Sequence, residues 1–259
     1  MNQNSIGFHE DRLFSQGEAK NLHGINARSY NNFSLDFCLD YLNKAENKNN
    51  TIIDIGCGWG GLIRELKKRI PNHSIETVGI EPIEDMAAVA SLFADQILPF
   101  DVDTFINSED NNNFIASANV VILSDVLEHL IDPWMTLNVL SSKMSLGSRI
   151  IISIPCISAI KSMRYIYNKG FSYRKSGIFD FTHLRFFTYA DILELVNVSI
   201  RRPKKIDLQR NLCPESYEII RDNKGPIDIT PDMKLYVRDK SRVQHDLCTR
   251  GVIGAVDLF

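Results

Sequence analysis

The segment best suited to hold a ligand is a glycine-rich run at residues 54–61, which reads DIGCGWGG. Glycine tolerates positive φ and leaves room for a ligand beside the backbone, so the run predicts a sharp turn that a nucleotide-like cofactor can approach. Gly56, Gly58 and Gly61 also satisfy the GxGxxG spacing of dinucleotide-binding oxidoreductases, in which such a turn holds a pyrophosphate. The glycines alone therefore leave the class of cofactor open.

The acidic residue before the turn distinguishes between the cofactors. Asp54 lies two positions before Gly56, and a carboxylate there repels a pyrophosphate. The same carboxylate can organise the turn around a ligand that carries an ammonium and a sulfonium group. S-adenosylmethionine has both positive groups and no phosphate, so Asp54 favours this cofactor over a dinucleotide.

With an acidic residue followed by xGxG, this turn resembles the first motif of the class I S-adenosylmethionine-dependent methyltransferases. The motif is matched by Asp54, Gly56 and Gly58. The resemblance implies that these three residues bind S-adenosylmethionine and that S-adenosylhomocysteine is the coproduct.

Two further acidic positions extend this resemblance. Glu81, in VGIEP, matches the family's acidic residue that accepts hydrogen bonds from both ribose hydroxyl groups, a geometry that suits the two oxygens of a carboxylate. Pro82 and Ile83 are then expected beside the adenine. Asp101 resembles the acid that the family places near the adenine amino group, although Asp103 could fill that role instead.

The stretch 124–133, SDVLEHLIDP, resembles a segment of certain small-molecule methyltransferases. In that subgroup it borders the methionine part of the cofactor, which implies cofactor-binding roles for Ser124 and Asp125. Glu128 and His129 recur in the same pattern. A histidine at the foot of a helix is more often a hydrogen-bonded structural residue than a catalyst, so we expect His129 to be structural.

Residues 180–188, DFTHLRFFT, resemble a segment of methyltransferases associated with surface-polysaccharide and related glycan biosynthesis, the methyltransferase-domain 23/12-like subgroup. The resemblance implies a small-molecule or glycan acceptor: a hydroxyl group on a sugar, a nucleotide-linked sugar or a glycan intermediate. Another small molecule, such as a quinone-like or natural-product precursor, is the alternative acceptor. A cofactor-binding partner that does not turn over is an alternative of a different class.

A hydroxyl acceptor must be aligned, shielded from water and relieved of its proton. A neutral imidazole suits the last task, so His183 is the candidate base. Asp180 is a possible orienting partner for it, and Arg185 a possible clamp for an anionic group of the substrate. The alternative is a polar network that only fixes the loop.

Aromatic and basic side chains alternate between residues 161 and 179. The aromatic members are Tyr165, Tyr167, Phe171, Tyr173 and Phe179, and the basic members are Lys161, Arg164, Lys169, Arg174 and Lys175. Such a stretch could form a lid that stacks on sugars, or equally a packed core with a solvated basic face. RNA stacking is also conceivable. However, 29 basic against 32 acidic residues give no strong nucleic-acid signal.

From residue 51 onward, short apolar runs alternate with helical periodicity, which is typical of βαβ units. The expected strands are 51–55, 75–80, 97–102, 120–123 and 149–154, with closing strands at 205–209 and 252–258. Pro99 lacks the backbone donor that a central strand needs, so the third run is expected at an edge. We therefore predict an α/β, Rossmann-like, doubly wound fold with a mostly parallel seven-stranded sheet and helices on both faces.

The helix signals are equally local. Asp132 is expected to cap a helix that has Pro133 in its first turn and Gly147 beyond its end. Thr188 is expected to cap another helix. An apolar pattern between Phe33 and Leu42 predicts an earlier helix.

These elements fit one domain in three parts. We expect an N-terminal helical cap (1–50), the S-adenosylmethionine-binding core (51–209), and an insertion with a closing strand of the same domain (210–259). No grouping of His, Cys or carboxylates has the spacing of metal ligands, so no metal is expected. The five cysteines are scattered, and no membrane span or signal peptide is evident, so a cytoplasmic location is expected. The oligomeric state is not predicted.

Overall fold

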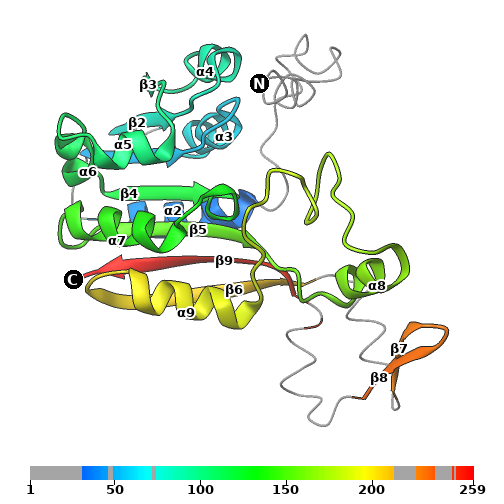
Figure 1. The fold of residues 1–259 in the computed structure, drawn as a ribbon. Coiled ribbons are helices and arrows are strands. Elements are labelled where there is room, and N and C mark those ends of the chain that lie inside the picture. Colours follow the sequence, from blue (N-terminus) through cyan, green and yellow to red (C-terminus); the bar gives the residue numbers. More distant parts are fainter. Residues whose placement is uncertain (1–30, 46–48, 72–73, 213–225, 237–246, 248) are drawn as a thin grey trace.

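The computed structural model describes residues 31–45, 49–71, 74–212, 226–236, 247 and 249–259. Its centre is a seven-stranded sheet with the order β3-β2-β1-β4-β5-β9-β6 (Figure 1). The strands are β1 (Asn49–Ile55), β2 (Ser74–Ile80), β3 (Gln96–Leu98), β4 (Val120–Ser124), β5 (Arg149–Pro155), β6 (Pro203–Leu212) and β9 (Thr249–Leu258). β1 to β5 pair in parallel, and β9 is antiparallel to both β5 and β6. The predicted fold class and both closing strands are confirmed.

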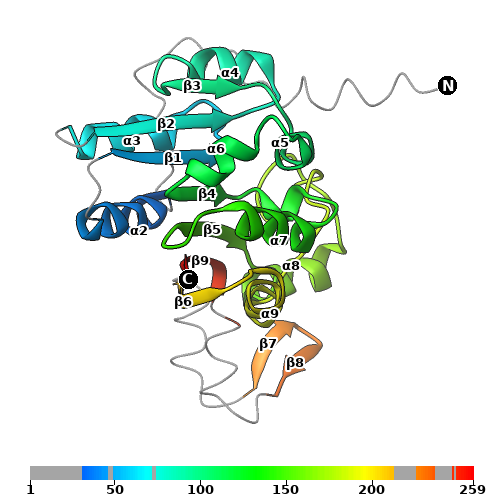
Figure 2. The same cartoon turned by 90° about the vertical axis from the view of Figure 1, so that its left-hand side faces the viewer.

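Helices cover both faces of this sheet (Figure 2). The helices are α2 (Asn31–Lys44), α3 (Gly61–Arg69), α4 (Glu84–Ala90), α5 (Val102–Asn107), α6 (Asn112–Ser117), α7 (Pro133–Lys143), α8 (Ile160–Lys169) and α9 (Tyr189–Ser199). α2 and α3 contribute to one apolar core, and α5, α6, α7 and α9 contribute to the other.

The central strands read as continuous apolar runs because both of their faces are buried. In β4, Val121 and Leu123 belong to the core under α7, whereas Val120 and Ile122 belong to the core under α2. The predicted caps are also confirmed. Asp132 accepts a hydrogen bond from the Met135 N–H at 2.9 Å, and Thr188 forms a capping box at the start of α9.

The third strand is shorter than predicted. It ends at Leu98, directly before Pro99, and lies at the sheet edge as expected. Asp101 accepts a hydrogen bond from the Thr104 N–H at 2.6 Å and thereby starts α5. The predicted strand 97–102 is therefore wrong beyond Leu98, because the proline ends the ladder and the aspartate caps a helix.

A hairpin of β7 (Ile227–Thr230) and β8 (Met233–Leu235) packs against α8 rather than joining the main sheet. Neither α8 nor the hairpin was predicted. The rest of the proposed insertion, 213–225, 237–246 and 248, lies outside the described residues, as does the cap before residue 31. Among the helices described, none combines the length and apolar character that a membrane crossing requires.

Candidate functional site

The glycine turn joins β1 to α3 and has room for a ligand on one side. The N–H groups of Gly56 and Cys57 donate to the Ile80 carbonyl at 2.8 and 3.1 Å, which fixes the turn against the end of β2. Gly56 and Gly58 have φ values of +68° and +54°, a region that favours glycine. Among the residues that the structure describes, none has an atom within 4 Å of a Cβ built at Gly58, so these residues leave the turn open at that position.

Glu81 follows β2 and holds the turn through both oxygens of its carboxylate. Its Oε2 accepts from the Gly58 N–H at 2.9 Å, and its Oε1 accepts from the Ile83 N–H at 3.0 Å. Each carboxylate oxygen has a second lone pair, so Glu81 can still accept from a diol. Burial raises the pKa of this carboxyl group.

Asp54 lies at the end of β1 and is 3% exposed. Burial, followed by repulsion from Glu81, raises the pKa of Asp54 from 3.8 to about 7. Two carboxyl groups thus share one interior region, where a phosphate would add repulsion and a cationic ligand would relieve it. This pair of carboxyl groups fits the positively charged S-adenosylmethionine, and the described residues leave space for it beside Gly58.

The remaining residues predicted beside the nucleoside follow neighbouring strands. Pro82 is exposed, and Ile83 is half-buried at the start of α4. Asp101 follows β3 at the surface, where its Oδ1 caps α5. Asp103 lies in the first turn of that helix and is also exposed.

Ser124 and Asp125 lie where β4 ends. The hydroxyl groups of Ser124 and Ser34 are 3.0 Å apart, so α2 reaches this edge of the sheet. Asp125 has a φ of +55°, an uncommon conformation for a residue with a side chain that often marks a functional position. Its Oδ1 accepts from the Ser153 hydroxyl group at 2.8 Å.

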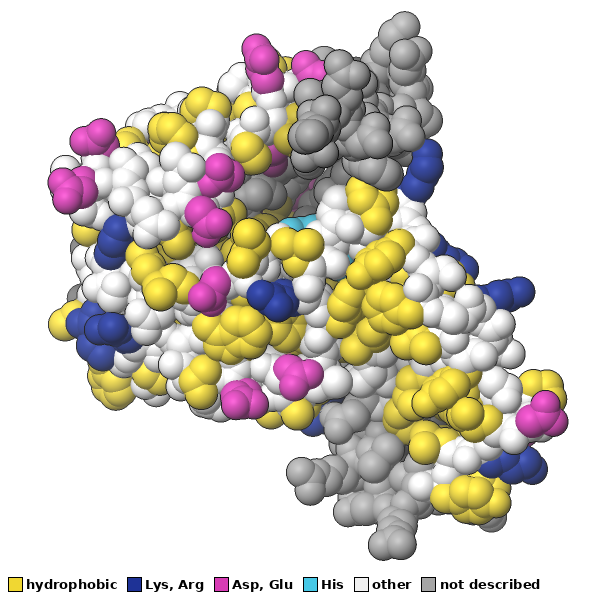
Figure 3. Space-filling model, in the orientation of Figure 1, with side chains coloured by type: hydrophobic (Ala, Val, Ile, Leu, Met, Phe, Trp, Pro, Cys, Tyr) yellow, Lys and Arg dark blue, Asp and Glu magenta, His cyan; other side chains and the backbone are white. Residues whose placement is uncertain are grey.

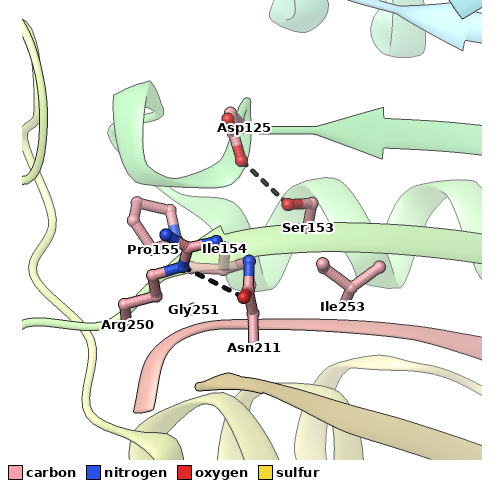
Figure 4. A pocket seen from close by; sticks show the side chains of 8 residues that line it. All are labelled: Asp125, Ser153, Ile154, Pro155, Asn211, Arg250, Gly251 and Ile253. Carbon is pink, nitrogen blue, oxygen red and sulfur yellow. Dashed lines mark hydrogen bonds between the residues drawn. The ribbon is translucent and has the colours of Figure 1, made fainter. Parts of the chain in front are cut away.

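Asp125 and Ser153 border a cavity of about 240 Å³ between β4, β5, β6 and β9 (Figure 4). Its other polar side chains are Asn211 and Arg250, joined by a hydrogen bond of 3.0 Å from Arg250 Nε. Sequence reasoning missed both residues. They reach Asp125 only through the pairing of β9 with β5 and β6, which no local pattern reveals.

The segment 180–188 docks on a single 3-10 turn, Leu127–His129, beyond the carboxyl ends of β4 and β5 (Figure 1). The backbone N–H groups of Leu184 and Arg185 both donate to the Glu128 carbonyl, at 2.9 and 3.0 Å. This contact brings His183 beside His129, with ring centroids 4.8 Å apart. The space-filling view shows histidine atoms at the floor of a recess on this face (Figure 3).

The neighbours of His183 make hydrogen bonds within the protein. The carboxylate of Asp180 accepts from the backbone N–H and the hydroxyl group of Thr182, at 2.9 and 2.7 Å. The Ile178 carbonyl lies 3.0 Å from Nδ1 of His183 and helps to orient its ring. Asp180 thus also fixes Thr182, and its role as an orienting partner of His183 stays a prediction.

Arg185 is likewise engaged within the protein. Its guanidinium group donates to the Ile131 carbonyl and lies over the Trp134 ring, 5.9 Å from the ring centroid. These contacts hold the segment 180–188 against the start of α7. Arg185 is nevertheless an exposed side chain, so its role as an anion clamp stays a prediction.

Three side chains suited to metal ligation meet where the sequence spacing indicated none. Glu128, His129 and His183 place their ligand atoms within 4.8 Å of one another. The sequence separates His183 widely from the other two, so only the docking of the segment 180–188 on the 3-10 turn reveals the group.

An aromatic cluster lies next to this segment. Phe171 packs edge-on against Tyr173, Phe179 and Phe186, with centroid distances of 5.4, 5.4 and 5.0 Å. Arg174 lies 4.0 Å from the centroid of the Tyr165 ring. Phe171 and Tyr173 are about half exposed, so the predicted aromatic stretch contributes an accessible apolar face.

Comparison with known proteins identifies the family. A family model described as a methyltransferase domain matches residues 29–197, more than half of the chain. No curated protein gives a significant sequence match.

Several solved structures share the fold. The plantazolicin methyltransferase BpumL in complex with SAH superposes with a TM-score of 0.58 and 14% identity, covering 97% of this chain and 94% of that one. A possible histamine N-methyltransferase from Thermotoga maritima superposes with a TM-score of 0.53 and 16% identity, covering 96% of this chain and 98% of that one. A complex between the Haloferax volcanii Trm112 methyltransferase activator and a putative methyltransferase contains a chain that gives a TM-score of 0.53 and 14% identity, with 96% of each chain covered. At these identities the likeness concerns the fold.

Proposed function

The chain belongs to the methyltransferase-domain family, whose class I members use S-adenosylmethionine, and we propose that it methylates a hydroxyl group on a sugar, a nucleotide-linked sugar or a glycan intermediate. The observation that carries the proposal is the position of His183. Its ring lies in a buried cluster of polar side chains beyond the carboxyl ends of β4 and β5. Open α/β sheets bind ligands at this edge.

The cofactor residues act by holding and orienting. Glu81 would accept hydrogen bonds from the ribose hydroxyl groups while it keeps the turn fixed through Gly58. Asp54 would favour the positive charges of S-adenosylmethionine. Ser124 and Asp125 would border the methionine part of the cofactor. When bound, S-adenosylmethionine supplies a methyl group on a positively charged sulfur.

Methyl transfer to a hydroxyl group forms an oxygen–carbon bond, breaks the carbon–sulfur bond and releases the hydroxyl proton. His183 is the group proposed to receive that proton at Nε2, since its Nδ1 is engaged by the Ile178 carbonyl. Glu128 Oε1 lies 4.0 Å from Nε2, and its negative charge would stabilise the imidazolium that forms. Positioned proton acceptors contribute about 10² to 10⁴-fold to such rates.

The aromatic cluster around Phe171 supports an acceptor with an apolar face. Sugar rings present such faces to aromatic side chains, and exposed aromatic rings are suited to this contact. The same cluster equally favours a second candidate, a flat aromatic acceptor such as a quinone-like precursor. The two acceptors differ in polarity, so a panel of both kinds separates them.

Two measurements test the proposal in sequence. Calorimetric titration with S-adenosylhomocysteine, beside NADH in the same buffer, should show binding of the former alone. Radiolabelled S-adenosylmethionine is then incubated with nucleotide sugars, glycan fragments and aromatic hydroxy compounds. Label transferred to a sugar hydroxyl group supports the proposal, whereas label on the aromatic compounds alone would support the second candidate.

A further inference from the structure

The group formed by Glu128, His129 and His183 has the composition of a metal site. Glu128 Oε1 lies 3.9 Å from His129 Nε2 and 4.0 Å from His183 Nε2. The carboxylate is only 1% exposed, and His183 is also buried, whereas His129 is 27% exposed. The three ligand atoms therefore lie close together, with two of the side chains buried and His129 the most exposed of the three.

The hydrogen bonds of both rings fix which nitrogen carries the proton. His183 Nδ1 faces the Ile178 carbonyl, which can only accept, so Nδ1 is the donor. His129 Nδ1 lies 3.1 Å from the Thr182 carbonyl and 3.0 Å from its hydroxyl group. That hydroxyl group donates to Asp180, so it accepts from His129. In the neutral rings both Nε2 atoms then carry a lone pair, and both face the same carboxylate.

Two imidazole lone pairs and a carboxylate within 4.8 Å of one another are the kind of ligands that a divalent cation takes. Histidine ligands in proteins donate their second N–H to a carbonyl or carboxylate, as both rings do here. Two histidines and one glutamate form a zinc site that leaves a fourth position open. We propose that Glu128, His129 and His183 bind a divalent first-row metal cation such as zinc.

The distances are compatible with this assignment. Zinc bonds of about 2.0–2.1 Å separate tetrahedral ligand atoms by about 3.4 Å. Glu128 Oε1 exceeds this separation from each imidazole nitrogen by about half an ångström, and no pair of ligand atoms in the group is more than 4.8 Å apart, so side-chain movements of about 1 Å would close the site. The scaffold holds them close already, because two N–H groups of the segment 180–188 donate to the Glu128 carbonyl. Asp180 fixes Thr182, which in turn orients His129.

The site also has a chemical use, which rests on the proposed function. A cation with an open position polarises an oxygen that approaches it and lowers the pKa of a hydroxyl group. In that case His183 acts as a ligand, and the cation takes over the task of making the acceptor oxygen nucleophilic. Metal binding itself does not depend on the identity of the acceptor.

The test measures metal binding separately from catalysis. The full chain, prepared without a polyhistidine tag and dialysed against EDTA, is titrated calorimetrically with zinc chloride, and with cobalt chloride while visible absorption is recorded. We expect about one equivalent to bind in the wild type. Glu128→Gln and His183→Asn should weaken zinc binding at least tenfold. Asparagine can keep the Nδ1-like donor toward Ile178 while it removes Nε2.

The controls separate a lost ligand from a lost fold. Glu194→Gln removes the same charge from an exposed position on α9 and should leave zinc binding unchanged. Each variant is also titrated with S-adenosylhomocysteine, and His129→Asn, at the most exposed ligand, serves if a buried substitution prevents folding. The proposal is overturned if the wild type binds no zinc, or if all three ligand variants bind it as the wild type does.

The two proposals can fail independently of each other. Zinc binding together with methyl transfer only to aromatic compounds would overturn the sugar acceptor and support the metal site. Methyl transfer to a sugar by a chain that binds no zinc and is insensitive to EDTA would support the sugar acceptor and overturn the metal site.

Discussion

The backbone N–H of Gly58 donates to Oε2 of Glu81 at 2.9 Å, which ties the turn after β1 to the end of β2. The second carboxylate oxygen accepts from the Ile83 N–H at 3.0 Å. One side chain thus fixes two successive strand-to-helix connections. Such preorganisation reduces the ordering cost that a ligand must overcome when it binds.

Replacement of Glu81 by glutamine should therefore weaken the cofactor site. An amide has only one oxygen, so it cannot accept from both N–H groups and a ribose at once. We expect the affinity for S-adenosylhomocysteine to fall at least tenfold, which corresponds to about 1.4 kcal/mol. Titration calorimetry measures the change, with Glu76→Gln at an exposed position of β2 as the control. Equal affinities in the wild type and Glu81→Gln would contradict the assignment.

The two glycines of the turn should respond differently to alanine. At Gly56 a Cβ would lie 2.7 Å from Cγ2 of Val126, and φ is positive, so Gly56→Ala should destabilise the fold by about 1–3 kcal/mol. At Gly58 the Cβ would meet none of the described residues within 4 Å, so Gly58→Ala should cost less stability. If the cofactor occupies the space beside Gly58, Gly58→Ala should instead lower the affinity for S-adenosylhomocysteine.

Urea denaturation and calorimetry on the same two variants separate these effects. Val126→Ala, combined with Gly56→Ala, should recover the part of the loss that comes from the steric contact. A stable Gly58→Ala variant with unchanged affinity would show that the ligand does not approach the turn there.

Asp54 should make the protein less stable as the pH rises. Its pKa is raised from 3.8 to about 7 in the folded state, so the folded chain retains a proton that the unfolded chain loses. The free energy of unfolding should therefore fall between about pH 4 and pH 7, by on the order of 4 kcal/mol. Asp54→Asn, which has no proton to lose, should remove this fall.

Urea denaturation at pH 5 and pH 8 provides the measurement. The free energy of unfolding of Asp54→Asn, relative to that of the wild type, should be higher at pH 8 than at pH 5. The affinity of this variant for the cofactor should be lower than that of the wild type. If the difference in stability between variant and wild type is the same at both pH values, the pKa of Asp54 is not raised in the folded state.

The elements that could be predicted are those whose signals are local. Asp132 followed by Pro133 predicted the start of α7, and the apolar run at Val120 predicted the strand that became β4. The end of β3 was misjudged because Asp101 belongs to a cap that competes with extension of the strand. The hairpin β7–β8 was missed because its apolar side chains pack on α8 rather than on the sheet.

The candidate site divides in the same way. The glycine turn and Glu81 are marked by short motifs, because strand, turn and helix follow one another in the chain. Arg250 approaches Asp125 only through the antiparallel register of β9. His183 reaches Glu128 only because its segment docks on the 3-10 turn. Such contacts depend on tertiary structure, for which a single sequence carries no local signal.

His183→Asn should separate catalysis from cofactor binding. The asparagine keeps a donor toward the Ile178 carbonyl but has no group that can take a proton or bind a metal at Nε2. We expect kcat to fall about 10² to 10⁴-fold, the range for a lost general base, with nearly unchanged affinity for S-adenosylhomocysteine. The alternative, a histidine that only fixes the loop, predicts a lower unfolding temperature with nearly full turnover.

Added imidazole provides a readout that a structural role would not change. It can enter the space left by the ring and accept a proton there, so it should restore part of the turnover of His183→Asn. It should have no such effect on Arg185→Lys, in which the contact with the Ile131 carbonyl is altered but His183 is retained. Full turnover of His183→Asn without imidazole would exclude His183 from the reaction and leave the polar network as its role.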